Sequence, residues 1–301
     1  MTTPPAFLTV RELADLLRVK ERKVYQLAAD GEVPCRRVTG KLLFPRQDIE
    51  AWIAGDTSAE RARDTIPPIP DPDRPAIIAG SHDPLLDWAI RESGAALPTL
   101  FDGSLDGLER FGKSEASVAA IHIPEAMGAR WNIGAVQALG PARNAVLISW
   151  AKRSRGLVLA AGNPLGIESV EDLAGKRLVP RQERAGSQVL FRQLLEREGL
   201  DGEAVAWSTP PARTESELGE AVRTGRADAG LGLVSAAGQS GLTFVPLVEE
   251  EFDLLVSRKF YFEPPFQALL GFARSALFRD RAAELGGYDI SELGRVRDNA
   301  P

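Results

Sequence analysis

The sequence is poor in the residues that build disulfide frameworks and metal sites. Its 301 residues include one cysteine, Cys35, and two histidines, His82 and His122. A single cysteine excludes a disulfide within the chain and a zinc site built on cysteine pairs. Neither histidine has carboxylates around it at a recognisable metal-ligand spacing. We therefore expect no metal site and assign the histidines structural or ligand-lining roles.

Long apolar runs and the common cofactor motifs are also missing. No stretch approaches the ~18 consecutive apolar residues of a membrane-spanning helix. The start, MTTPPAFLTV, lacks a basic segment followed by an apolar run. The phosphate-loop, dinucleotide-binding and HExxH zinc patterns are absent. These absences predict a cytoplasmic protein that is not an enzyme, holds no cofactor and does not associate with a membrane.

Charge is distributed unevenly along the chain. The formal net charge is -6, yet residues 1–55 carry 9 Lys and Arg against 7 Asp and Glu, which leaves -8 for the remainder. Residues 18–46 hold 8 basic and 3 acidic residues. A small basic segment on an acidic chain predicts one surface for phosphate and another for a different partner. A basic solvated face is the alternative interpretation.

The basic segment has the spacing of a helix-turn-helix. Thr9 followed by Glu12 predicts a capping box, and apolar residues at helical spacing predict a helix over 10–17. After a break at 18–20, a second helix is expected over 21–28, apolar on one face and basic on the other. The outward-facing residues of this second helix are Arg22, Lys23 and Gln26.

A hairpin and a third helix are expected to follow. The runs 35–38 and 41–44 flank Thr39-Gly40, where glycine supplies the positive φ of a tight turn. The third helix is expected to begin at Pro45. The residues expected to pack from this helix on the first two are Ile49, Trp52 and Ile53.

The segment TVRELADLLRVKERKVYQLAADGEVPCRRVTGKLLFPRQDIEAWI resembles the winged helix-turn-helix of excisionase-type and MerR-like proteins. The resemblance rests on the patterns VxxxxVYxL, DGxxP and DIEAWI. It implies a DNA-binding domain over 1–55, with the second helix in the major groove, Tyr25 partly in the core, and the hairpin as a wing. The implied contacts to DNA are Arg22, Lys23 and Gln26 on the helix and Arg36, Arg37 and Lys41 on the wing. A domain that binds protein is the alternative.

Beyond the head the pattern changes. Five prolines within 67–75 predict an extended linker, placed at 56–75. From 76 to 301 apolar runs alternate with helical patterns, which predicts a doubly wound α/β domain with mainly parallel strands. Within this domain, 144–150 and 156–161 are expected to be two separate strands.

Three Gly-Ser pairs stand at equivalent places in this α/β pattern. They are Gly80-Ser81, Gly103-Ser104 and Gly186-Ser187. Ligands of α/β folds bind beyond the carboxyl ends of strands, against helix N-termini. There glycine lets backbone amides approach, and serine adds an uncharged donor, which together suit an anion. For each serine taken alone, a helix N-cap is the better explanation, and only the recurrence at three equivalent places favours an anion site.

The segments GSHDPLLDWAI, GLVLAAGNPLGIESVEDLAGKRLVPRQERAGSQVLFRQLL and AVRTGRADAGLGLVSAAGQSGLTFVPLVEEEFDLLV together resemble the periplasmic-binding-protein-like domain. This domain also occurs in bacterial regulators and attached to molybdopterin-biosynthesis proteins. The resemblance implies a type II, two-lobed α/β domain over 76–301, with lobe 1 at about 76–152 and 255–301 and lobe 2 at about 153–254. It also implies crossover strands near 147–160 and 244–257, and a small anionic effector, molybdate or tungstate. The implied ligand-binding residues are Ser81, His82, Ser104, His122, Arg181, Gln182, Gly186 and Ser187.

Together the two resemblances predict a one-component transcriptional regulator. We expect a homodimer or higher homo-oligomer that binds a double-stranded DNA operator and responds to a small anion. Relatives often read NRQxGSGTR where this chain has PRQERAGSQV, which leaves open an organic anion or a pterin-like ligand. An enzyme or accessory protein of molybdenum-cofactor metabolism, and a protein-binding adaptor, are the alternatives from other classes.

Overall fold

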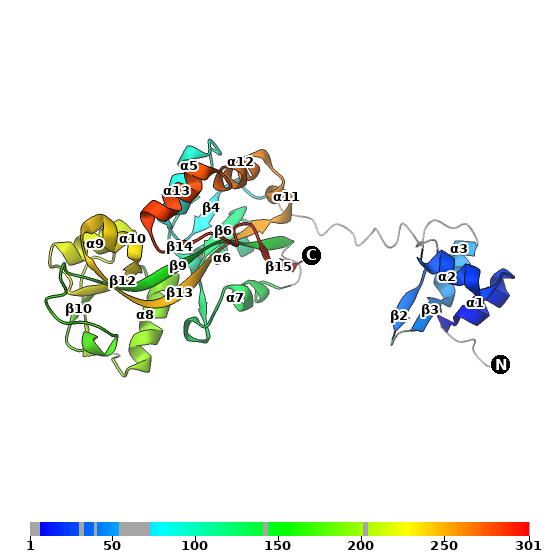
Figure 1. Cartoon of the computed structure of the whole chain (residues 1–301), viewed down its shortest axis with the longest axis horizontal. Helices are drawn as coiled ribbons and strands as arrows, with labels where there is room; N and C mark the ends of the chain where they lie inside the picture. The colour runs from blue at the N-terminus through cyan, green and yellow to red at the C-terminus, as the bar shows by residue number, and fades with distance from the viewer. Residues whose placement is uncertain are drawn as a thin grey trace. The chain divides into compact units, whose positions relative to one another are not determined.

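The chain forms two units. The computed structural model describes residues 7–29, 33–38, 41–53, 73–140, 144–200 and 204–300, without the side chains of residues 36–38, 41, 47, 51, 127 and 300. Contacts divide the chain into Met1–Pro70, the head, and Asp71–Pro301, the body (Figure 1). The predicted turns at 30–32 and 39–40, and the predicted linker up to residue 72, lie outside the described residues. No helix in the described ranges is long and apolar enough to cross a membrane.

The head is a helix-turn-helix with a small antiparallel sheet. The capping box of the first helix is confirmed, because Thr9 Oγ1 accepts from Glu12 N at 3.3 Å and the Glu12 carboxylate accepts from Thr9 N at 2.7 Å. Leu13, Val24 and Ile49 are fully buried and join the helices in one core. The elements are β1 (Phe7–Leu8), α1 (Val10–Leu17), α2 (Glu21–Ala29), β2 (Arg36–Val38), β3 (Lys41–Pro45) and α3 (Arg46–Ile53), with strand order β1-β3-β2.

Three local expectations for the head were wrong. Pro45 does not begin the third helix but ends β3, because the unpredicted strand β1 pairs with it, Phe7 opposite Pro45. Ile53 is the last residue of α3 and is 49% exposed. Tyr25 is 53% exposed rather than partly in the core, since it lies one position, about 100°, around the helix from buried Val24.

The body has two lobes. In lobe 1, helices α5, α12 and α13 pack together over one face of the sheet, around Trp150, Phe266 and Phe278. The elements of lobe 1 are β4 (Ile78–Gly80), α5 (Pro84–Glu92), β5 (Thr99–Leu100), α6 (Ser104–Gly112), β6 (Val118–Ile121), β7 (Pro124–Glu125), η1 (Ala126–Gly128), β8 (Arg130–Trp131), α7 (Ile133–Gln137), α11 (Arg258–Tyr261), α12 (Pro264–Ala273), α13 (Ala276–Leu285), β14 (Tyr288–Asp289) and β15 (Val296–Ala300). Those of lobe 2 are η3 (Glu171–Leu173), β10 (Arg177–Val179), α8 (Gly186–Arg197), β11 (Ala206–Trp207), α9 (Glu215–Arg223), β12 (Ala229–Leu233) and α10 (Val234–Ser240).

Two long strands join the lobes. They are β9 (Ala145–Leu159) and β13 (Thr243–Ser257), which pair antiparallel along their length and run side by side through both lobes (Figure 1). In the sheet order β11-β10-β12-β9-β13-β6-β4-β5, the strands of lobe 2 lie on one side of this pair and those of lobe 1 on the other. In this order the pairs β11-β10, β10-β12, β6-β4 and β4-β5 are parallel, but every pair that includes β9 or β13 is antiparallel. The sheet is therefore mixed rather than mainly parallel. Strands β7 and β8 form a separate antiparallel pair.

The prediction of two separate strands at 144–150 and 156–161 was wrong. Lys152, Arg153, Ser154 and Arg155 interrupt the apolar pattern, yet they lie in the middle of the single strand β9. Arg153 and Arg155 are each 1% exposed. A strand crosses this point without a turn because acidic residues of neighbouring elements compensate the charge of both arginines.

Strands β9 and β13 leave no room for a side chain at Gly156. A Cβ atom on Gly156 would lie 2.0 Å from the backbone oxygen of Val245. We therefore predict that Gly156→Ala lowers the free energy of unfolding by about 1–3 kcal/mol, the cost of overpacking a rigid core. Urea denaturation measures this difference.

Gly238→Ala is the matched control. Gly238 lies in α10, and a Cβ atom there would meet nothing within 4 Å, so the same change should be neutral or stabilise the helix by up to about 1 kcal/mol. Equal stabilities of the two variants would contradict the tight crossing.

Candidate functional site

A small hollow lies where the two lobes meet. It has a volume of about 10 Å³, room for roughly one water molecule. Six of the eight predicted ligand-binding residues line it: Ser81, His82, His122, Arg181, Gln182 and Ser187. The other two, Ser104 and Gly186, lie directly behind this lining. The fold therefore brings together residues that are up to 106 positions apart in the sequence, from Ser81 to Ser187.

None of the three predicted serines is a helix N-cap. The caps of α5, α6 and α8 are Asp83, Gly103 and Ala185, and the last two helices have no side-chain cap bond. Ser81 Oγ and Ser104 Oγ are instead 2.8 Å apart. Ser104 Oγ also accepts from the backbone N–H of His122 at 3.0 Å. Helix N-capping therefore does not explain the positions of Ser81, Ser104 and Ser187.

Two glycines let the lobes touch. A Cβ atom on Gly186 would lie 2.1 Å from the backbone oxygen of His122, and one on Gly103 would lie 2.7 Å from that of Arg184. Across the same boundary Leu105 N donates to Arg184 O at 3.2 Å. The N-terminus of α8 in lobe 2 therefore packs directly on lobe 1, and any larger side chain at Gly186 would separate them.

Two buried polar atoms around the hollow have no hydrogen-bond partner among the described residues. They are Gln182 Oε1 and His82 Nδ1. The His82 ring packs edge-on against Phe101, with 5.7 Å between the ring centroids. Burial lowers the pKa of this imidazole, and this effect outweighs the opposite effect of the nearby carboxylates. A buried polar atom without a partner costs roughly 1–3 kcal/mol. Among the described residues that line the hollow, these two atoms are therefore buried polar groups with unused hydrogen-bonding capacity.

A buried network of ion pairs lies beneath the hollow, on the two long strands β9 and β13. Arg153 and Arg155 of β9 both bind Glu250 of β13, Arg155 Nε at 2.7 Å and Arg155 Nη2 at 2.8 Å. Arg153 Nη1 also reaches Asp83 Oδ2 at 2.8 Å. His122 Nδ1 lies 3.0 Å from Glu250. These residues are all less than 4% exposed, so each charge depends on its partners.

The network extends into both lobes. In lobe 1, Asp83 caps α5 through Leu86 N at 2.7 Å and accepts from the Tyr288 hydroxyl at 2.7 Å. In lobe 2, Glu215 accepts from Arg181 Nη1 at 2.8 Å and from Leu233 N at 2.9 Å. The network thus contains as many arginines as carboxylates, and its charges balance. The arginines are Arg153, Arg155 and Arg181, and the carboxylates are Asp83, Glu215 and Glu250.

This balance changes the role predicted for Arg181. Its Nε donates to Ala212 O at 2.9 Å and its Nη2 to Arg213 O at 3.0 Å, while Nη1 is bound to Glu215. Arg181 lines the hollow, but its charge is already compensated. Exposed Arg213 also lines the hollow and is paired with Asp102. Besides these compensated arginines, the described part of the site offers an anion uncharged donors and helix N-termini.

The protonation states in the network follow from burial and charge. Burial raises the pKa of Glu215, but Arg155 and Arg181 outweigh it and lower that pKa to about 2. The pKa of Glu250 is also lowered well below its usual value, against the effect of burial, by Arg153 and Arg155. Burial lowers the pKa of His122 to about 4 and outweighs the opposing Glu250. At neutral pH Glu215 and Glu250 are charged and His122 is neutral.

Sequence reasoning named His122 and Arg181 but missed the other residues of this network, which are Asp83, Arg153, Arg155, Glu215 and Glu250. The signal was nevertheless present, because basic residues interrupt one predicted crossover strand at 152–155 and acidic residues interrupt the other at 249–251. Charges of opposite sign at the middle of two pairing strands predict a cross-strand ion pair. The remaining partners, Asp83 and Glu215, had no such signal, since only folding brings their helices to the strands.

Two lobes joined by two crossing strands, with helix N-termini meeting at a hollow between them, define a ligand-binding protein of the two-lobed type. The chain belongs to the PBP superfamily: the model of the PBP superfamily domain matches residues 88–274. A helix-turn-helix domain model matches residues 7–57. The predicted fold class, a small helix-turn-helix domain with a two-lobed α/β domain, is therefore confirmed.

Comparison with individual proteins agrees with this assignment. The uncharacterized protein YvgK of Bacillus subtilis (strain 168) is 24% identical over 299 residues, 96% of each chain. A solved structure from Clostridium perfringens, described as a phosphate ABC transporter substrate-binding protein with bound phosphate, has a TM-score of 0.53 at 11% identity. It covers 70% of this chain and 97% of that one, so it shares the fold of the body.

The lowered pKa of His122 predicts how stability depends on pH. A histidine of folded pKa about 4 and ordinary value 6.5 binds a proton more readily when unfolded, so it lowers stability as pH falls from 6.5 towards 4. His122→Gln removes this contribution. The free energy of unfolding of the variant, relative to that of the wild type, should therefore increase by about 1 kcal/mol for each unit by which the pH is lowered in that range.

Urea unfolding of both proteins at pH 6.5, 5.5 and 4.5 measures this difference, because groups that titrate in both proteins cancel. A difference that stays constant with pH would show that His122 is not held neutral by burial.

Proposed function

We propose that the protein is a ligand-responsive DNA-binding regulator, cytoplasmic and homo-oligomeric, whose effector binds between the lobes of the body. The observation that carries the proposal is the convergence of Ser81, His122 and Ser187 on one hollow with the unpartnered atoms of His82 and Gln182. The helix-turn-helix head supplies the DNA-binding half. The output is a change in the affinity of the head for its operator.

The chemistry of the hollow supports a small anion as effector. The N-terminus of the 12-residue helix α8 reaches it, and a helix N-terminus attracts negative charge. Ser81 and Ser187 add uncharged donors, and the arginines beneath are compensated. Molybdate or tungstate is the effector that the family resemblance implies. A larger organic anion or pterin-like ligand is the alternative in the same cleft.

Binding must be coupled to movement of the lobes. A hollow of about 10 Å³ holds roughly one water molecule, so an oxyanion enters only when Gly186 and Gly103 move away from their contacts across the boundary. A ligand that binds one arrangement of lobes better shifts the population towards it, and the shift equals its difference in affinity for the two. This coupling is the proposed signal to the head.

An enzymatic function is disfavoured by the same network. Glu215, with a pKa of about 2, is a weak base, and Glu250 is committed to two arginines and His122. The buried groups are therefore arranged as fixed charges rather than as proton acceptors for chemistry.

The exposed face of α2 is the proposed DNA-reading surface. Arg22, Lys23 and Gln26 are exposed, whereas Val24 on the same helix is fully buried and fixes its orientation. Exposed Tyr25 belongs to the same surface. The side chains of Arg36, Arg37 and Lys41 lie outside the described ones, and their contacts with a DNA backbone stay part of the proposal.

We predict that Arg22→Ala combined with Lys23→Ala weakens binding to a fluorescent duplex of random sequence. Each lost phosphate contact should reduce the slope of log K against log salt by about 1. Fluorescence anisotropy at several salt concentrations measures both effects. Arg192→Ala, an exposed arginine of the body with a 3.6 Å ion pair, is the control and should bind as the wild type. If the double variant binds the duplex with the affinity and salt dependence of the wild type, α2 does not contact DNA through Arg22 and Lys23.

We predict that a small anion stabilises the full-length protein through the hollow. Molybdate, tungstate, sulfate, phosphate and a few carboxylates are screened by thermal shift and then calorimetry. At about 100 times Kd the effector should add about 2.7 kcal/mol of stability, and Ser81→Ala and Ser187→Ala should lose this gain. The control is Ser291→Ala, because Ser291 is exposed and does not line the hollow. This variant should keep the stabilisation by the effector. A screen without an inorganic hit would reject the oxyanion and favour the larger ligand.

A further inference from the structure

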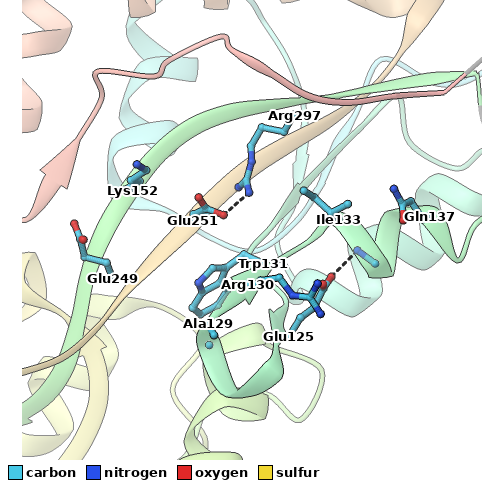
Figure 2. Close-up of a pocket in the computed structure, with 12 residues that line it drawn as sticks. Glu125, Ala129, Arg130, Trp131, Ile133, Gln137, Lys152, Glu249, Glu251 and Arg297 are labelled. Atoms are coloured by element: carbon cyan, nitrogen blue, oxygen red, sulfur yellow. Dashed lines mark hydrogen bonds and ion pairs between the residues drawn. The ribbon is translucent and has the colours of Figure 1, made fainter.

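The body has a second, larger cavity besides the hollow between the lobes. It is a groove of about 540 Å³ between strands β9 and β13 and the chain from β7 to α7 (Figure 2). Charged side chains of the groove are held by neighbours around it, because Arg297 pairs with Glu251, and Glu125 accepts from Gly134 N at 2.7 Å. The hollow differs, because one charged side chain of its lining is held from the opposite lobe.

That side chain is Arg213, which belongs to lobe 2 and reaches across to lobe 1. Its Nη2 donates to Asp102 Oδ1 at 2.5 Å. The backbone of Arg213 is fixed within lobe 2, since its N–H donates to Glu217 at 2.7 Å and its carbonyl oxygen accepts from Arg181 at 3.0 Å. The guanidinium therefore moves with one lobe and the carboxylate of its partner with the other.

The ion pair of Arg213 differs in this respect from that of Arg181. Arg181 pairs with Glu215 of the same lobe, and both residues are buried, so this pair persists when the lobes part. Parting the lobes separates Arg213 from Asp102. The side chains of these two residues are 63% and 45% exposed, and an ion pair with that exposure to water is weak. Arg213 is thus the arginine of the hollow that an anion can most easily take over.

Unused hydrogen-bonding capacity lies in the same lining. His82 Nδ1 and Gln182 Oε1 are buried and have no partner among the described residues, and both residues line the hollow together with Arg213. The hydroxyls of Ser81 and Ser187 belong to this lining as well. A ligand that reaches Arg213 from the hollow is therefore surrounded by polar groups that can bind it.

We propose that Asp102 holds Arg213 in place of the effector, and that a small oxyanion binds by exchanging this carboxylate for its own anionic oxygen. The inference rests on the proposed function, because it concerns the effector of the same hollow. A bound oxyanion repels Asp102 and so disfavours the arrangement in which Asp102 pairs with Arg213. The two arrangements of the lobes then differ in which group neutralises Arg213, and the anion shifts the population between them.

A second ion pair across the same boundary provides a matched control. Arg184 of lobe 2 pairs with Glu109 of α6 at 2.5 Å and donates to Leu105 O at 3.1 Å. The side chains of Arg184 and Glu109 are 50% and 40% exposed, close to the values of the first pair, but neither residue lines the hollow. Glu109→Gln therefore removes a similar contact between the lobes without freeing an arginine in the site.

The test is calorimetric titration of the full-length protein with molybdate, tungstate, sulfate and inorganic phosphate. Asp102→Asn removes the charge of the competing side chain and keeps its shape. It should lower the Kd of the bound oxyanion by about two- to fivefold, the strength of an exposed ion pair. Arg213→Gln should raise the Kd, and by a larger factor in the Asp102→Asn protein than in the wild type. Glu109→Gln should bind the oxyanion as the wild type does.

The double variant of Asp102→Asn and Arg213→Gln distinguishes exchange from simple repulsion. Exchange predicts that Asp102→Asn lowers the Kd less once Arg213 is absent, whereas an equal effect in both backgrounds would show repulsion alone and overturn the proposal. An unchanged Kd in Asp102→Asn, or an equal gain in Glu109→Gln, would also overturn it and leave the oxyanion effector in place. If none of the four oxyanions binds the wild type or Asp102→Asn, the oxyanion effector is rejected together with the exchange.

Discussion

The body depends on one interaction, the contact of Glu250 with Arg153 and Arg155 where the lobes join. Removing a charge from water costs several kcal/mol even after relaxation, and only close partners offset it. Here every buried arginine of the network faces a carboxylate, which fixes the register of β9 on β13. Asp83 and Glu215 then bind a helix of each lobe to that centre. The lobes are thus tied to a charged hinge rather than to an apolar one.

The site follows from this hinge. Since the charges beneath the hollow cancel, the hollow itself presents serine hydroxyls, a neutral histidine, helix N-termini and Arg213, which is paired with Asp102. Gly186 allows α8 to touch the backbone of His122, so the space between the lobes is small.

Much of the candidate site could be predicted from residues near strand ends. The Gly-Ser pairs at 80–81, 103–104 and 186–187 predicted a convergence that the fold brings about at one hollow. The break predicted at 152–155 failed because polarity there was interpreted as exposure. Buried arginines are rare without paired acids, and the acidic partners of Arg153 and Arg155 lie at least 60 positions away in the sequence.

The sequence by itself determined the helix-turn-helix, the α/β pattern of the body and the residues that converge between the lobes, because local spacing and turn chemistry report which face of each element is buried. Only the tertiary structure decided that β9 is one continuous strand and that Arg181 is neutralised by Glu215. These outcomes depend on pairings between distant segments, and the free energy of a buried charge is set by the partner that folding places beside it.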